Sequence, residues 1–152
     1  MSDLLAAWDT GPAALTELGA THNHAYRVDA DGGSRYLLRL HVARRKQHEI
    51  DLELDWLDVL AARGWPSVPG PQRTRDGSWT ATVDVAVPDD DEVGLRRAVV
   101  GASGERVERR LASLLTWHDG DMLSSLPASS DAGPFAETLA ALHEAGADPA
   151  AV

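Results

Sequence analysis

Hydrophobic and polar residues alternate in two short runs that lie on either side of a polar turn. The first run ends at Val28, the second covers residues 36–41, and the sequence Asp-Gly-Gly at 31–33 separates them. A period of two is typical of β-strands, and Asp-Gly favours a tight turn. The pattern therefore predicts a β-hairpin. One face of its second strand carries Tyr36, Leu38 and Leu40, and the other carries Leu37, Arg39 and His41.

The segment after the hairpin has the period of an α-helix. Its apolar residues fall within an arc of about 120° and form the stripe that faces a core; they are Ile50, Leu54, Leu57, Leu60 and Ala61. Glu53 lies inside this arc, whereas Asp51, Asp55 and Asp58 lie on the solvent side. A carboxylate on a buried face needs a cationic partner. Arg39 on the neighbouring strand is the predicted partner of Glu53.

Several further elements follow from turn signals and from shorter patterns. The residues Ser2-Asp3 favour the start of a short helix with Leu4, Leu5 and Trp8 as its apolar face. Residues 14–19 lead into the hairpin, and the polar residues 21–24 are expected to form a loop. Gly64 and Pro66 end the long helix. Strands are expected at 79–87, 95–100 and 107–117, and a helix at 134–146.

Charge and composition narrow the classes of function. The 152 residues carry a net charge of −10, contain no cysteine and have an estimated pI of 4.9. The acidic balance argues against a nucleic-acid partner, and the missing cysteines exclude a disulfide framework. No signal peptide is evident, and no apolar run approaches the ~18 residues of a membrane span. We therefore expect one modest domain in the cytoplasm, without a membrane partner.

Two clusters of charged or metal-binding residue types lie outside these elements. His22 and His24 have no third ligand at a helpful spacing, so no metal site is predicted. Arg44, Arg45 and Lys46 open the long helix region. They are either a solvated basic patch or a contact for phosphate or substrate.

Six sequence segments, in this order and spacing, resemble the aminoglycoside phosphotransferase family with its choline and homoserine kinase relatives. They are GATHNHAYRV at 19–28, YLLRLH at 36–41, ELDWLDVL at 53–60, SVPGPQRTRDG at 67–77, LLTWHDG at 114–120 and LAALH at 139–143. The resemblance implies an α+β fold: the small lobe of a protein kinase, an antiparallel β-sheet with one packed helix, plus the first helix of a large lobe. Residues 1–120 would be the nucleotide-binding lobe ending in a hinge, and 121–152 the start of a C-terminal lobe.

The same resemblance implies a nucleotide site for ATP (or GTP) with Mg²⁺. The loop before the first strand would lie over the phosphates, and the hinge would pair with the adenine edge through backbone groups of Thr116 and His118. The implied cofactor-binding residues are Thr21, His22, Asn23, Val28, Leu37, Arg39, Glu53, Thr116, Trp117 and His118. Arg39 departs from the family pattern, in which lysine is commoner, and arginine favours the ion pair over a point contact with phosphate.

The catalytic half of the family pattern is absent from these residues. The family supplies its acid and its magnesium ligands from an HxDxxxxN motif and a later acid, and His118 is followed directly by Asp119 instead. We therefore predict no catalytic residues and an inactive chain that is truncated, split or degenerate. The alternative is a non-catalytic interaction domain that binds a separate C-terminal lobe or forms a homodimer through apolar surface near 114–117 and the C-terminal helix. A purely structural α+β domain is the third possibility.

Overall fold

A computed structural model describes most of the N-terminal part of the chain and a few residues near its C-terminus. The described residues are 2–20, 23–65, 68–86, 99–100, 106–119, 137, 140–141 and 143–144. The chain divides into two compact units, Met1–Trp117 and His118–Val152. In the second unit the described residues 137, 140–141 and 143–144 are helical, as predicted for this segment.

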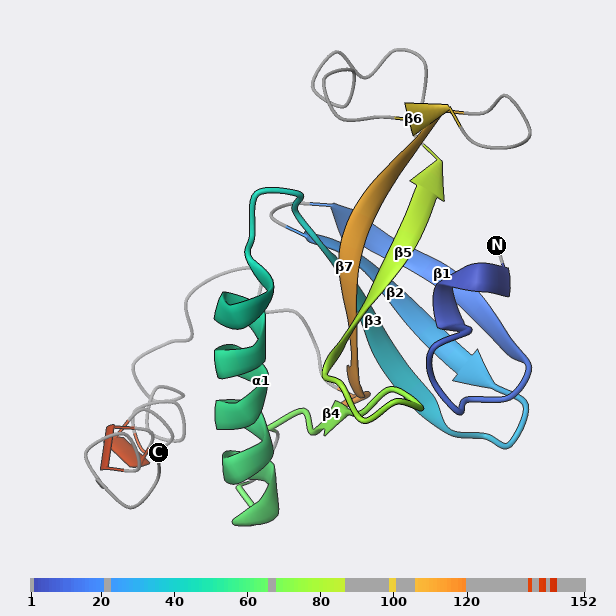
Figure 1. The fold of residues 1–152 in the computed structure, drawn as a ribbon. Helices are drawn as coiled ribbons and strands as arrows, with labels where there is room; N and C mark the ends of the chain where they lie inside the picture. The colour runs from blue at the N-terminus through green and yellow to red at the C-terminus, as the bar shows by residue number, and fades with distance from the viewer. Residues whose placement is uncertain are drawn as a thin grey trace. The chain divides into compact units, whose positions relative to one another are not determined.

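An antiparallel sheet forms the body of the first unit (Figure 1). In the described residues its strands are β1 (Ala13–Ala20), β2 (Asn23–Ala30), β3 (Arg35–His41), β4 (Pro71–Gln72), β5 (Thr80–Ala86), β6 (Val99–Val100) and β7 (Arg106–Thr116). The order is β1-β2-β3-β7-β4, and β5 and β6 also pair with β7. Strand β3 therefore has a neighbour on each side, and this pairing fixes the face of the sheet to which each of its side chains points.

The predicted hairpin is confirmed as β2 and β3. Its strands pair from Asp29 opposite Arg35 to Asn23 opposite His41. In the turn the Gly33 amide donates to Ala30 O at 2.8 Å, and Gly33 has a φ of 81°. Glycine adopts this left-handed conformation without the cost that a Cβ would bring.

The segment before the hairpin was predicted wrongly. Residues 13–20 form strand β1 rather than a lead-in, and Asn23 and His24 belong to β2 rather than to a loop. The alternation of β1 is hard to read because its register with β2 shifts between Glu17 and Gly19. Such a bulge interrupts the period of two on which strand prediction depends.

Helix α1 (Gln47–Ala62) ends where the sequence predicts, and it begins just after Lys46. At its start, the carboxylate of Glu49 accepts a hydrogen bond from the Lys46 amide at 3.3 Å. At its end, Gly64 has a φ of 74°, its amide donates to Ala61 O, and the Trp65 amide donates to Leu60 O. This pair of bonds is the Schellman motif, which satisfies carbonyls left free at a helix end.

Each face of the sheet has its own hydrophobic core. On one face Val28, Leu38 and Leu40 pack with Leu5 and Trp8, which belong to the 3-10 helix η1 (Ser2–Leu5) and the turn after it. On the other face the α1 residues Ile50 and Leu54 pack against Trp79 and Leu115. Figure 1 shows α1 and η1 on opposite sides of the sheet. The predicted apolar stripe of the helix is thus confirmed as the buried one.

The later strands agree with the sequence pattern wherever they are described. Val83 is buried in the first core, with Ala81 and Val85 packed against it, as the alternation predicts. Val87 and residues 95–98 lie outside the described residues. The expectation of exposed apolar surface near 114–117 is wrong for Leu114 and Leu115, which are buried on opposite faces of the sheet, whereas Trp117 is partly exposed. None of the described helices is long and apolar enough to span a membrane.

Candidate functional site

An ion pair joins the central strand β3 to helix α1. The guanidinium Nη2 of Arg39 donates to Oε1 of Glu53 at 2.5 Å. The two side chains are 19% and 33% exposed, so water reaches the pair only in part. Arg39 points to the α1 side because it alternates with the buried Leu38 and Leu40, and Glu53 lies beside the buried Leu54. The predicted pairing of these two residues is therefore present.

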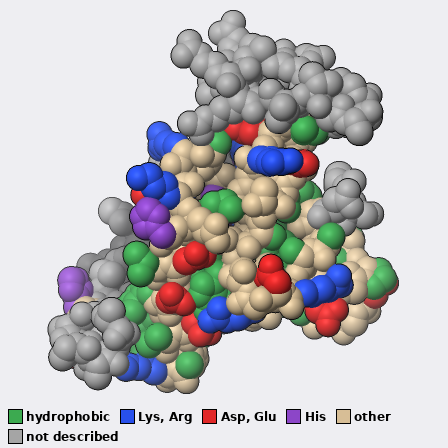
Figure 2. Space-filling view, in the orientation of Figure 1, with side chains coloured by type: hydrophobic (Ala, Val, Ile, Leu, Met, Phe, Trp, Pro, Cys, Tyr) green, Lys and Arg blue, Asp and Glu red, His purple; other side chains and the backbone are tan. Residues whose placement is uncertain are grey.

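A second guanidinium binds the other oxygen of the same carboxylate. Arg45, in the turn between β3 and α1, donates from Nη1 to Oε2 of Glu53 at 2.8 Å and from Nη2 to Glu49 O at 3.3 Å. Arg44 and Lys46 on either side are exposed. Figure 2 shows Lys and Arg side chains gathered over this turn. Two residues of the basic run, Arg44 and Lys46, thus form a solvated patch. Arg45 instead belongs to a partly buried cluster that the sequence did not predict.

The two arginines keep Glu53 ionised. Burial raises the pKa of a carboxyl, but hydrogen bonds and charge from Arg39 and Arg45 outweigh it and hold the pKa of Glu53 below its ordinary value. One carboxylate between two guanidinium groups leaves the cluster with an excess positive charge. Arg39 also has a buried Nε donor without a hydrogen-bond partner. The cluster therefore has the charge and the donor capacity to bind an anion.

His41 lies beside this cluster on the same face of β3 and is 1% exposed. Its Nε2 is 2.9 Å from the hydroxyl of Ser113, and its Nδ1 is buried without a partner. Burial and the charge of Arg39 lower the pKa of His41 to about 4, so the ring is neutral at pH 7. The alternation in the sequence puts His41 on the same face as Arg39, as observed, but it indicates no role for the ring.

The strand register corrects one of the predicted nucleotide-binding residues. Leu37 lies on the same face as Arg39, but Val28 pairs with Tyr36 and is fully buried in the core on the opposite face. The β2 residues that share the Arg39 face are Ala25, opposite Arg39, and Arg27, opposite Leu37. Val28 therefore lies one residue out of step with the Arg39 face, and in a strand one residue moves a side chain to the other face.

The residues predicted to lie over the phosphates are only partly described. Thr21 and His22 lie outside the described residues. Asn23 is in β2 opposite His41, and its Oδ1 is buried without a hydrogen-bond partner. Asn23 is therefore close in register to the Arg39 cluster, two positions along the strand from Ala25.

The predicted hinge residues differ in how their backbone groups are used. The Thr116 amide donates to Gly70 O at 2.8 Å, and the Gly70 amide donates to the Thr116 hydroxyl at 2.8 Å. The Trp117 amide donates to Arg35 O at 3.1 Å. The Thr116 N–H is therefore used within the sheet, and the pairing of an adenine edge with backbone groups of Thr116 and His118 stays a prediction. His118 is exposed and belongs to the second compact unit.

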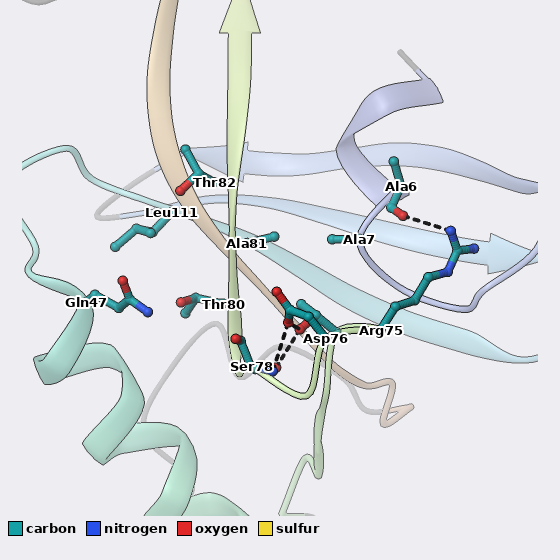
Figure 3. A pocket seen from close by; sticks show the side chains of 11 residues that line it. Ala6, Ala7, Gln47, Arg75, Asp76, Ser78, Thr80, Ala81, Thr82 and Leu111 are labelled. Atoms are coloured by element: carbon teal, nitrogen blue, oxygen red, sulfur yellow. Dashed lines mark hydrogen bonds between the residues drawn. The ribbon is translucent and has the colours of Figure 1, made fainter.

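A pocket of about 410 Å³ opens beside β5, between the turn after η1, the turn at 74–78 and the start of α1 (Figure 3). The Asp76 carboxylate in this turn accepts hydrogen bonds from Thr74 and Ser78, and Arg75 donates to Ala6 O. Gln47 and Thr80 contribute neutral polar groups. The lining residues come from four separate segments of the chain, so no pattern along the sequence predicts this pocket.

No group of three or more metal-binding side chains gathers within the described parts of the chain. His24 is 3.8 Å from Glu17, a contact between two residues on paired strands. The Mg²⁺ that the family resemblance implies has no ligand set among these residues, so no step is assigned to it.

Two of three comparisons with known proteins find matches. The model of the phosphotransferase enzyme family matches residues 15–151. A microcompartment-associated aminopropanol kinase of known structure has a TM-score of 0.62 and 26% sequence identity, and the match covers 92% of this chain and 38% of that one. No curated protein sequence matches the chain.

A second solved structure supports the fold. It is an amicoumacin kinase in complex with AMP-PNP, Ca²⁺ and Ami, with a TM-score of 0.51 and 20% identity. The match covers 82% of this chain and 31% of the amicoumacin kinase. The chain therefore spans well under half the length of either kinase, and the predicted fold and family are confirmed over that part.

Proposed function

Since the chain belongs to the phosphotransferase enzyme family, we propose that it provides the nucleotide-binding lobe of an ATP-dependent small-molecule kinase. The observation that carries the proposal is the Arg39–Glu53 pair between the central strand and the packed helix. Phosphoryl transfer depends mainly on positioning and on compensating phosphate charge. A guanidinium held in place by a carboxylate suits both tasks.

The chemistry of the described residues fits an anionic nucleotide. Arg39 would donate to phosphate oxygens, while Glu53 fixes the direction of its guanidinium plane. Leu37 and Ala25 offer a small apolar surface on the same face for the base. The structure of the amicoumacin kinase contains AMP-PNP, a nucleoside triphosphate analogue. This supports the same class of ligand for this chain.

The phosphate acceptor would be a small molecule with a hydroxyl group. The two similar structures are named for aminopropanol and amicoumacin, which are different acceptors. The 152 residues contain no His-x-Asp sequence, the pattern from which the family draws its catalytic acid. We therefore expect this chain alone to bind nucleotide without transferring phosphate.

The test compares ATP and adenosine binding to the full chain by calorimetry. We expect Arg39→Gln to weaken ATP binding by about ten-fold or more, because a charged hydrogen bond is lost. Adenosine, which has no phosphates, should bind both proteins equally. Arg44→Gln is the matched control, since Arg44 is an exposed arginine five positions away. Absence of ATP binding, or equal effects of the two substitutions, would contradict the proposal.

An assay of ATP consumption with aminopropanol completes the test. The expected result is no turnover above the rate without protein. Turnover that Arg39→Gln abolishes would show instead that the chain is a complete catalyst.

A further inference from the structure

Arg45 is the part of the Glu53 cluster that the proposed function leaves unexplained. One carboxylate needs one cation, and Arg39 already provides it. A second arginine that contacts the other oxygen at 2.8 Å is therefore more than charge compensation requires. Arg45 is also 30% exposed, close to the 33% of Glu53, so the two side chains are equally withdrawn from water.

The way Arg45 is held indicates a fixed position. Its backbone amide donates to Val42 O at 3.0 Å within the turn, and its Nη2 donates to Glu49 O in the first turn of α1. The guanidinium thus connects the β3–α1 turn, the helix backbone and the Glu53 side chain. Arg44, one residue earlier, is exposed.

Each of the two arginines contacts a different oxygen of the Glu53 carboxylate. Arg39 contacts Oε1 and Arg45 contacts Oε2, each through one terminal nitrogen. Loss of one partner therefore leaves Glu53 with the other. If one arginine turns to another anion, a carboxylate that still has a second cation loses little stabilisation. A carboxylate left unpaired in a partly buried site would lose much more.

We propose that Arg45 is a positioning residue, which holds Glu53 so that Arg39 can share its guanidinium with the phosphates of a bound nucleotide. This inference rests on the proposed function. In a cluster with Arg39 and Glu53 alone, a phosphate would compete directly with Glu53 for the same guanidinium. With Arg45 in place, Glu53 stays compensated and ordered while Arg39 donates to the ligand.

The experiment measures the dissociation constants of ATP and adenosine for the full chain and its variants by calorimetry. We expect Arg45→Gln to weaken ATP binding by about five- to ten-fold and to leave adenosine binding unchanged. Arg45→Lys keeps a cation near Glu53 and should recover most of the ATP affinity. Arg44→Gln is the control and should bind both ligands as the unchanged chain does.

A double-substitution cycle tests whether Arg45 acts through Glu53. In a Glu53→Gln background, Arg45→Gln should change ATP affinity by less than about two-fold, because the carboxylate that it positions is gone. An undiminished effect in that background would mean a direct phosphate contact and would overturn the inference. An equal loss of adenosine and ATP binding would also overturn it, since that indicates general structural damage.

The outcomes separate this inference from the proposed function. If the unchanged chain binds ATP and Arg39→Gln weakens it while Arg45→Gln does not, the nucleotide site stands and the role of Arg45 is wrong. If the unchanged chain binds no ATP, both are wrong.

Discussion

At the scale of single residues, the stability of the site depends on Glu53 more than its one-third exposure suggests. The carboxylate compensates two guanidinium groups that are 19% and 30% exposed. Removing one side of a buried ion pair costs about 3–5 kcal/mol, and loss of an exposed pair costs about 0–1 kcal/mol. This cluster lies between those limits, because water reaches each of its members.

We predict that Glu53→Gln lowers the free energy of unfolding by about 1–3 kcal/mol, since it leaves both guanidinium groups uncompensated. Asp58→Asn, on the exposed face of the same helix, should change it by less than about 0.5 kcal/mol. Urea unfolding of both variants measures the difference. Identical midpoints would mean that Glu53 contributes no more than a surface acid.

His41 makes stability depend on pH. Its pKa falls from 6.5 to about 4 on folding, because burial and Arg39 disfavour the charged ring. Between these values the unfolded chain binds more protons, so stability should decrease as pH falls from 6.5 to about 4. The integrated loss is about 3 kcal/mol.

The measurement is the free energy of unfolding at several pH values from 7 to 4. His41→Gln keeps a hydrogen-bonding group for Ser113 but does not titrate, so its curve should be flatter between pH 6.5 and 5. Below that range we expect a further decrease in stability, because protonation of Glu53, whose pKa is lowered in the folded chain, removes its charge contacts with both arginines. Parallel curves for the two proteins above pH 5 would exclude His41 as the cause.

At the scale of elements, helix α1 is attached to the sheet by a polar contact as well as by its apolar stripe. The indole Nε1 of Trp79 donates to the Asp55 carboxylate at 2.5 Å, and Arg73 stacks over the Trp79 ring at 3.4 Å. Trp79 is 6% exposed, so its N–H has little access to water. Sequence analysis treated Asp55 as a purely solvent-facing acid, which overlooked this contact.

We predict that Asp55→Ala lowers the free energy of unfolding by about 1–2 kcal/mol, because a buried donor loses its acceptor. Asp58→Ala has the same chemistry on the same helix, three residues further on, and should cost less than half as much. Thermal and urea unfolding of the pair provide the comparison. Equal losses would reduce the Trp79 contact to a surface interaction.

At the scale of the whole molecule, both hydrophobic cores and the Arg39 cluster belong to residues 1–117. We predict that a chain ending at Trp117 still unfolds in one cooperative transition. Its urea midpoint should lie close to that of the full chain. Circular dichroism and fluorescence transitions that fail to coincide, or a loss of the transition, would show that the second unit is needed for folding.

The sequence by itself determined the elements whose patterns are local and regular. Alternation and Asp-Gly-Gly fixed the β2–β3 hairpin, a helical stripe fixed α1, and Gly64 fixed its end. The partnership of Arg39 with Glu53 was also predictable, because both lie at known positions on predictable elements and a half-buried charge needs a partner.

Only the tertiary structure decided which faces and segments meet. It assigned Val28 to the core opposite Arg39, because strand register depends on pairing between strands and one residue reverses a face. It brought Arg45 to Glu53, Trp79 to Asp55 and His41 to Ser113. The first of these contacts depends on the path of a turn, the second on the packing of α1 against the residue before β5, and the third on the pairing of β3 with β7. No periodicity along the chain records such a path, so these contacts were decided by packing.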